Sequence, residues 1–166
     1  MSAVRTWPQR SAYSRRKVPT SASASADGGL YLLLVRVAGA VDARIGRLGT
    51  FALSPGLYIY VGSACRGLTK RVARHERREK PLRWHIDYLT TLPQASVVAS
   101  VLIRDVPKQA GGSAQSLGTG RRAADAECRL NQWVGRLLDA DVPIPGFGAG
   151  DCRAGCPAHL WFVPGS

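Results

Sequence analysis

The chain has 166 residues, 45% of them hydrophobic, and it carries a formal net charge of +12 at pH 7. This length and composition fit one domain with a continuous core. The excess of positive charge predicts an anionic partner, with nucleic acid ahead of an acidic membrane surface. The longest apolar stretch is strand-sized, far below the roughly 20 residues that span a bilayer. We therefore expect a soluble protein with no membrane partner.

The cysteines and the start of the chain bear on the cellular compartment. The four cysteines are Cys65, Cys128, Cys152 and Cys156. They are too few and too unevenly spaced for a disulfide scaffold, and no secretory leader is visible, so we expect a reducing, cytoplasmic location. For a bacterial protein this means association with the nucleoid. Residues 1–27 are rich in Arg, Ser and Ala, which predicts a disordered basic arm and leaves organelle targeting open.

Hydrophobic periodicity predicts five strands and three helices beyond the basic arm. The strands are expected at 29–37, 50–53, 57–62, 97–103 and 159–163, and the helices at 67–79, 84–92 and 121–140. Within 57–62, alternation sends Leu57, Ile59 and Val61 to one face and the phenols of Tyr58 and Tyr60 to the other. Residues 107–120 and 143–155 are expected to be loops.

The most specific segment follows the third predicted strand. It runs Tyr60-Val-Gly-Ser-Ala-Cys-Arg-Gly-Leu-Thr-Lys-Arg71-Val-Ala-Arg-His75. A strand ending in Tyr-Val-Gly thus leads through a short turn into a helix that bears an arginine and, one turn later, a histidine. Upstream, Gly29-Leu30-Tyr31 supplies a Gly-Leu-Tyr element, and Gly56-Leu57-Tyr58 is a competing match.

These segments resemble the signature of the GIY-YIG endonuclease superfamily. Trp84-His-Ile-Asp-Tyr-Leu89 and the tail from Asp151 to Leu160 resemble a little-characterised branch found alone or fused to endonuclease III-type DNA glycosylases. The family draws its tyrosines from two paired strands, which favours Tyr31 over Tyr58, and an inserted strand would explain the long connection to Tyr60. The resemblance implies an α/β (α+β) fold over residues 28–166, with a small, mostly antiparallel central sheet flanked by helices.

The resemblance also implies chemistry, namely metal-dependent hydrolysis of a phosphodiester. The implied catalytic residues are Tyr31, Tyr60, Arg71 and His75, and the implied ligand of one Mg²⁺ or Mn²⁺ ion is Glu127. Arg71 would bind phosphate oxygens, and a tyrosine with a lowered pKa would deprotonate water. Which tyrosine does so is open. Taken singly, each residue also has an ordinary explanation: packing for the tyrosines, a solvated helix face for Arg71, and the helix dipole for Glu127.

Basic residues are concentrated beside this motif. Between Arg66 and Arg83 lie eight Lys and Arg side chains against two acids, which favours contacts with a phosphate backbone. The candidate nucleic-acid contacts are Gly62, Ser63, Lys70, Arg74, Arg78 and His85. Ser63 stands where some repair nucleases have Lys. DNA is the expected partner, RNA is second because no RNA-binding motif is present, and a DNA-repair protein partner and the oligomeric state are open.

Two functions are compatible with these observations. The first is a structure-selective or weakly sequence-selective endonuclease in DNA repair or processing. The alternative is a non-catalytic nucleic-acid-binding module that retains the fold, which predicts salt-sensitive binding without metal-dependent cleavage.

A second metal site has weaker support. Cys152, Cys156 and His159 form a C-x3-C-x2-H pattern, which Cys128 or His85 could complete to four zinc ligands. The competing interpretation is a reduced cysteine pair in a tight turn, with the histidine hydrogen-bonded. Structural zinc normally has two well-formed ligand pairs in sequence, so we do not expect a structural Zn²⁺ ion from this spacing.

Overall fold

The computed structural model describes residues 27–104 and 120–164, with side chains in the second range from Ala124 onward. The expected basic arm, except Asp27, and nearly all of the expected loop at 107–120 lie outside these ranges. Asp27 is part of the folded domain, because its carboxylate accepts hydrogen bonds from the Thr69 backbone N–H at 3.2 Å and from Arg104 at 2.5 Å.

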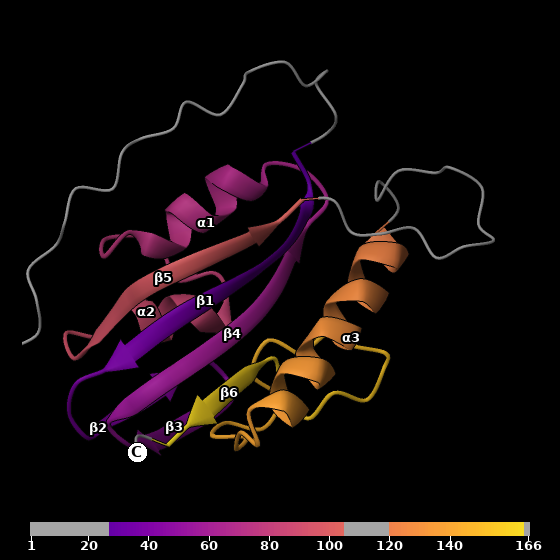
Figure 1. The fold of residues 1–166 in the computed structure, drawn as a ribbon. Helices are drawn as coiled ribbons and strands as arrows, with labels where there is room; N and C mark the ends of the chain where they lie inside the picture. Colours follow the sequence, from indigo (N-terminus) through magenta and orange to yellow (C-terminus); the bar gives the residue numbers. More distant parts are fainter. Residues whose placement is uncertain (1–26, 105–119, 165–166) are drawn as a thin grey trace, which may run out of the picture.

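A four-stranded antiparallel sheet forms the centre of the molecule, in the order β5-β1-β4-β6 (Figure 1). Its strands are β1 (Gly29–Val37), β4 (Gly56–Ala64), β5 (Ala95–Ile103) and β6 (Leu160–Val163). β1 pairs with β4 along its whole length, with Tyr31 opposite Gly62 and Leu33 opposite Tyr60. The expected α+β fold with an antiparallel sheet is confirmed.

A two-stranded hairpin fills the long connection between β1 and β4. It consists of β2 (Val41–Ile45) and β3 (Gly49–Leu53), paired antiparallel. Sequence analysis predicted only the second of these strands, although it expected an insertion at this place. Gly46 at the turn has a φ of 50°, where side chains are disfavoured, and it lies under the Tyr88 ring.

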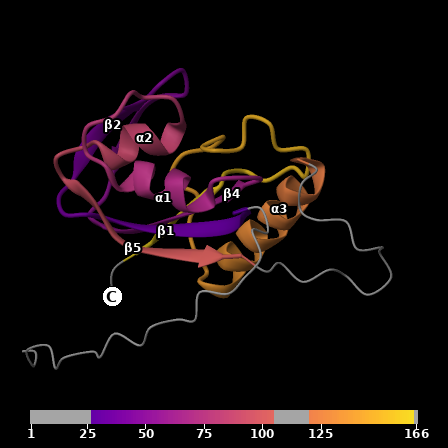
Figure 2. The same ribbon diagram turned by 90° about the horizontal axis from the view of Figure 1, so that it is seen from above.

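Three helices cover the two faces of the sheet. α1 (Leu68–Glu76) and α2 (His85–Thr90) lie on one face with the hairpin, whereas α3 (Gly120–Leu137) packs on the other (Figure 2). α1 is shorter than predicted, because Arg77 has an extended backbone with ψ at 137°. No helix in the described ranges is long and apolar enough to cross a membrane.

The sheet separates two apolar clusters. The larger one contains Tyr31 and Tyr60 with residues of α1, α2 and the hairpin, and the smaller joins Ile59 and Val61 to Val134 and Trp161 beneath α3. The alternation predicted for β4 therefore holds, with the phenols on the α1 face and the aliphatic side chains on the α3 face. Both faces of β4 are packed, which fixes the strand from which the site is built.

Candidate active site

Tyr31 and Tyr60 come together on the α1 face of the sheet. Their ring centroids are 6.1 Å apart, and both residues are buried, at 2% and 9% exposure. The Tyr31 ring lies directly on Gly62, where a Cβ would be 2.4 Å from the ring carbon Cζ. The glycine of the Tyr-Val-Gly element thus makes room for the tyrosine of the neighbouring strand. Tyr58 lies apart from them and donates its hydroxyl to the Ser54 carbonyl at 2.8 Å.

His75 connects Tyr31 to α1. Its Nε2 is 3.1 Å from the Tyr31 hydroxyl, and the side chain is buried at 1% exposure. Burial lowers the pKa of His75 to about 4, although the Asp87 carboxylate opposes the shift, so the imidazole is neutral near pH 7. Nδ1 forms no hydrogen bond but lies 3.5 Å from an Asp87 oxygen, and because a carboxylate can only accept a hydrogen bond, we place the hydrogen on Nδ1. Nε2 then accepts the hydrogen bond from Tyr31.

Asp87 is the buried anion of this region. Burial alone would raise the pKa of its carboxyl, but hydrogen bonds from Arg74 and from the Trp84 and Arg83 backbone amides outweigh burial and lower it. Arg74 donates to both carboxylate oxygens, at 2.8 and 3.1 Å. The amide contacts resemble a capping interaction at the start of α2. Asp87 therefore ties α1 to α2 and fixes the helix that carries His75.

The phenols are protonated in the resting protein. Burial raises the pKa of both Tyr31 and Tyr60 above the ordinary value of 10, and the positive charge of Arg71 only partly opposes this. The negative charge of Glu127 raises both further. The lowered tyrosine pKa that a general base needs is thus absent from the protein without metal and substrate.

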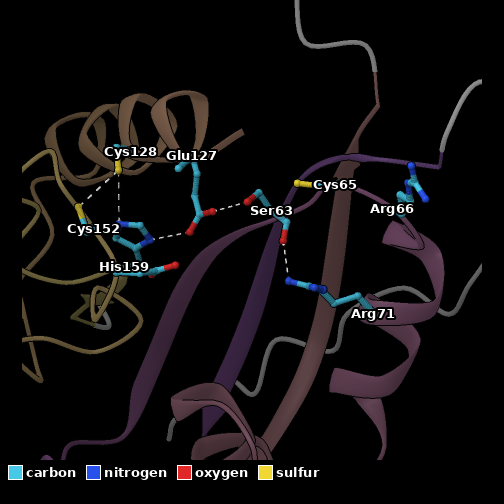
Figure 3. Close-up of a pocket in the computed structure, with 10 residues that line it drawn as sticks. Ser63, Cys65, Arg66, Arg71, Glu127, Cys128, Cys152 and His159 are labelled. Carbon is cyan, nitrogen blue, oxygen red and sulfur yellow. Dashed lines mark hydrogen bonds and ion pairs between the residues drawn. The ribbon is translucent and has the colours of Figure 1, made fainter. Parts of the chain in front are cut away.

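An open pocket with a volume of about 480 Å³ lies between the start of α1 and α3 (Figure 3). Arg71 lines it from α1, Glu127 from α3, and Ser63 from the end of β4. The Arg71 guanidinium donates to the Ser63 carbonyl at 2.9 Å, and the Ser63 hydroxyl donates to Glu127 Oε2. One residue of β4 thus joins a cation and an anion that come from opposite faces of the sheet.

The Glu127 carboxylate has two hydrogen-bond partners, Ser63 and His159, and further lone pairs that could bind a ligand. Its Oε1 lies 2.7 Å from His159 Nδ1, and 15% of its side chain is exposed. Burial lowers the pKa of His159, but interactions of the ring with Glu127 and with the Cys152 and Cys156 sulfurs outweigh burial and raise it to about 9. A carboxylate has about four lone-pair sites, so two remain at the pocket. This fits a Mg²⁺ or Mn²⁺ ion, which takes one or two protein carboxylates and otherwise water and phosphate oxygens.

Comparison with known families matches residues 30–165 to the domain of unknown function DUF123. The chain belongs to this family. No curated protein and no solved structure matches the chain. The matched range contains the sheet except Gly29, and every residue that lines the pocket, so the pocket is part of the DUF123 domain.

The DUF123 domain brings most of the predicted catalytic residues together, while other predicted contacts have structural partners. Ser63, Arg71 and Glu127 line the pocket. Tyr31, Tyr60, His75 and Gly62 contact one another on the α1 face but do not line it. Arg74 is bonded to Asp87, Arg78 donates to the Leu92 carbonyl at 2.8 Å, and His85 Nδ1 accepts from the Gly148 amide at 3.0 Å. Lys70 is exposed on α1. Contacts between these four residues and DNA stay predictions.

Sequence reasoning missed several residues of the DUF123 site. The pairing of Glu127 with His159, the position of Asp87 behind His75, and the pocket-lining role of Asp151 depend on how α2, α3 and the tail pack against the sheet. Residue spacing along the chain contains no signal for these contacts. The Trp84–Leu89 segment and the Asp151–Leu160 tail, both part of the resemblance, contain Asp87, Asp151 and His159 but did not indicate these contacts.

Proposed function

We propose that this domain is a GIY-YIG-type endonuclease that hydrolyses DNA phosphodiesters with Mg²⁺ or Mn²⁺. The observation that carries the proposal is the pocket in which Arg71 and Glu127 converge on Ser63, beside the buried Tyr31–His75 pair. Arg71 has a planar guanidinium suited to two non-bridging phosphate oxygens. Glu127 would hold the metal ion, which when bound would supply Lewis-acid stabilisation of negative charge on the phosphate.

The Tyr31–His75 hydrogen bond supports a base function for Tyr31. Neutral Nε2 accepts the hydrogen bond of the Tyr31 hydroxyl, so the lone pairs of the phenol oxygen can accept the proton of an attacking water. As Tyr31 takes that proton, its own passes to Nε2, and Asp87, 3.5 Å from Nδ1, partly offsets the burial that disfavours the imidazolium. The net transfer is one proton from water to His75. Tyr60 is the second candidate base, with its ring 6.5 Å from His75.

The DNA backbone is the proposed partner because exposed cations border the pocket. Arg66 lines it and is exposed, and Lys70 is exposed on the neighbouring turn of α1. Contacts of this kind bind phosphates without reading bases, which suits a structure-selective or weakly sequence-selective enzyme in DNA repair or processing. The four cysteines are free thiols, which is compatible with the cytoplasmic location that belongs to this proposal.

A cleavage assay tests the function. Labelled single-stranded, duplex, flap and branched DNA are incubated with the full chain and Mg²⁺ or Mn²⁺. We expect Arg71→Ala and Glu127→Gln to lose about 100-fold or more of the cleavage rate, the scale for removing one group that stabilises transition-state charge. Arg44→Ala on the hairpin removes the same charge as Arg71→Ala at an exposed position outside the pocket, and it should cleave normally. Equal rates in all variants would refute the assignment.

A non-catalytic nucleic-acid-binding module is the second candidate. It is favoured by one observation: both tyrosines are buried with raised pKa values, which leaves no ready base. Salt-sensitive binding to DNA without cleavage of any substrate, under either metal ion, would support this candidate over the endonuclease.

A further inference from the structure

Three cysteines and one histidine converge at one side of the pocket. They are Cys128 of α3, Cys152 and Cys156 of the segment that follows α3, and His159 just before β6. Their potential ligand atoms all lie within 4.8 Å of one another. Cys128 Sγ is 3.5 Å from Cys152 Sγ and 3.9 Å from His159 Nε2 (Figure 3). We call these four residues the cysteine–histidine cluster.

Two distances within the cluster are close to those between ligands of a tetrahedral metal ion. Zinc–sulfur bonds of about 2.3 Å separate two ligand sulfurs by about 3.8 Å, and a sulfur from a ligand nitrogen by slightly less. In the cluster the two sulfurs are slightly closer than this, at 3.5 Å, and the sulfur and nitrogen are slightly further apart, at 3.9 Å. A disulfide requires about 2.05 Å between sulfurs, and all four cysteines of the chain are free.

The surroundings of the cluster orient its ligands. His159 Nδ1 donates to Glu127, which fixes the ring so that Nε2 faces the sulfurs, an arrangement common for zinc-bound histidines. Cys152 and Cys156 lie on either side of a short bend in the chain. Gly155, with φ at 69°, adopts the left-handed conformation that closes this turn.

We propose that the cysteine–histidine cluster binds one structural Zn²⁺ ion. Thiolate and imidazole ligands select zinc over Mg²⁺, and four protein ligands leave no open position for a substrate. This revises the expectation from sequence spacing, because the fold supplies Cys128 as the fourth ligand. His85, the other sequence candidate, lies elsewhere and is bonded to Gly148.

The site explains how an irregular segment is held in place. Residues 138–159 contain no helix or strand beyond an isolated bridge at Asp141, yet Ile144, Phe147 and Ala158 are fully buried. A metal ion that joins this segment to α3 stabilises it without regular secondary structure. It also holds His159 against Glu127. The zinc proposal does not depend on nuclease activity.

Metal analysis of the full chain tests the proposal. We expect one zinc per chain after purification under reducing conditions without added metal or an affinity tag that binds metal. A thiol-reactive mercurial should release it, as measured with a coloured chelator. Cys152→Ser and Cys156→Ser each remove a metal ligand and should each lower zinc affinity by more than about 100-fold. This exceeds the 10–100-fold loss that follows from changing a residue that hydrogen-bonds to a ligand. Cys65→Ser, a cysteine outside the cluster, is the matched control and should keep its zinc.

Cobalt substitution of the wild type tests the ligands even if the variants do not fold. Co²⁺ should give thiolate charge-transfer absorption and the intense visible bands of a tetrahedral site. Two outcomes overturn the proposal: a Cys128–Cys152 disulfide found by mass spectrometry in place of metal, or reduced thiols that bind neither zinc nor cobalt. A protein that holds zinc but does not cleave DNA would refute the nuclease function and leave this site intact.

Discussion

His75 is a buried histidine whose titration couples the site to stability. Its pKa in the fold is about 4 against an ordinary 6.5, so between these values the unfolded chain binds a proton that the native state excludes. The free energy of unfolding therefore falls as pH is lowered from 6.5 towards 4, by up to about 3 kcal/mol, and is independent of this group above 6.5. Urea unfolding across that range measures the slope.

His75→Gln isolates the contribution of the imidazole. Gln does not titrate, and its amide can still accept the Tyr31 hydroxyl. Carboxylate titration and loss of any bound metal contribute in both proteins, so the difference between their pH profiles reports on His75. Parallel profiles between pH 6.5 and 4 would show that the imidazole is accessible to protons in the native state.

Among the elements, α3 is held against the sheet through Gly135. A Cβ at this position would be 2.5 Å from two atoms of the Trp161 ring, whose Nε1 donates to Asn131 Oδ1 at 2.7 Å. Ala in place of Gly favours an isolated helix by about 1 kcal/mol, but overpacking a buried contact costs about 1–3 kcal/mol. Since the ring is buried and hydrogen-bonded, we expect Gly135→Ala to lower the free energy of unfolding by about 1 kcal/mol.

Gly39 provides the matched control for this prediction. A Cβ there would meet no atom within 4 Å, so Gly39→Ala should change stability by less than about 0.5 kcal/mol. Chemical denaturation of both variants measures the two effects. A stabilising Gly135→Ala would mean that α3 sits further from β6 than the Trp161 contact implies.

The elements that sequence predicted are those with strong local periodicity. β1, β4 and α3 have apolar patterns that fix their type, and pairing of β1 with β4 then places Tyr31 beside Tyr60. β2 was missed because its run, Val41–Ile45, is short and carries alternating charges on an exposed face. The cysteine–histidine cluster was derived only in part: the spacing named Cys152, Cys156 and His159, but the choice of Cys128 as fourth member stayed open. Cys128 meets Cys152 only after α3 packs on the sheet.

At the scale of the whole molecule, the net charge of +12 supports binding to a polyanion. The fold shows which basic side chains already bind oxygen atoms of the protein itself. Arg74, Arg78 and Lys80 are bonded to protein oxygens around α1 and α2, and Lys80 is nearly buried, at 2% side-chain exposure. The salt dependence of DNA affinity should therefore reflect fewer phosphate contacts than the number of basic residues between Arg66 and Arg83 suggests.

Arg66 offers a direct test, because it is exposed and lines the pocket. Each phosphate contact contributes about −0.9 to the slope of log affinity against log salt for duplex DNA. Arg66→Ala should make that slope shallower by about 1, with a similar loss of affinity on every sequence, whereas Arg44→Ala on the hairpin should leave it unchanged. Binding isotherms for a duplex and a branched DNA at several salt concentrations measure both. Equal slopes for the two variants would mean that DNA binding depends on the net charge of the molecule and not on the position of Arg66. A change confined to Arg66→Ala would place the phosphate backbone at the mouth of the pocket, within reach of Arg71 and Glu127.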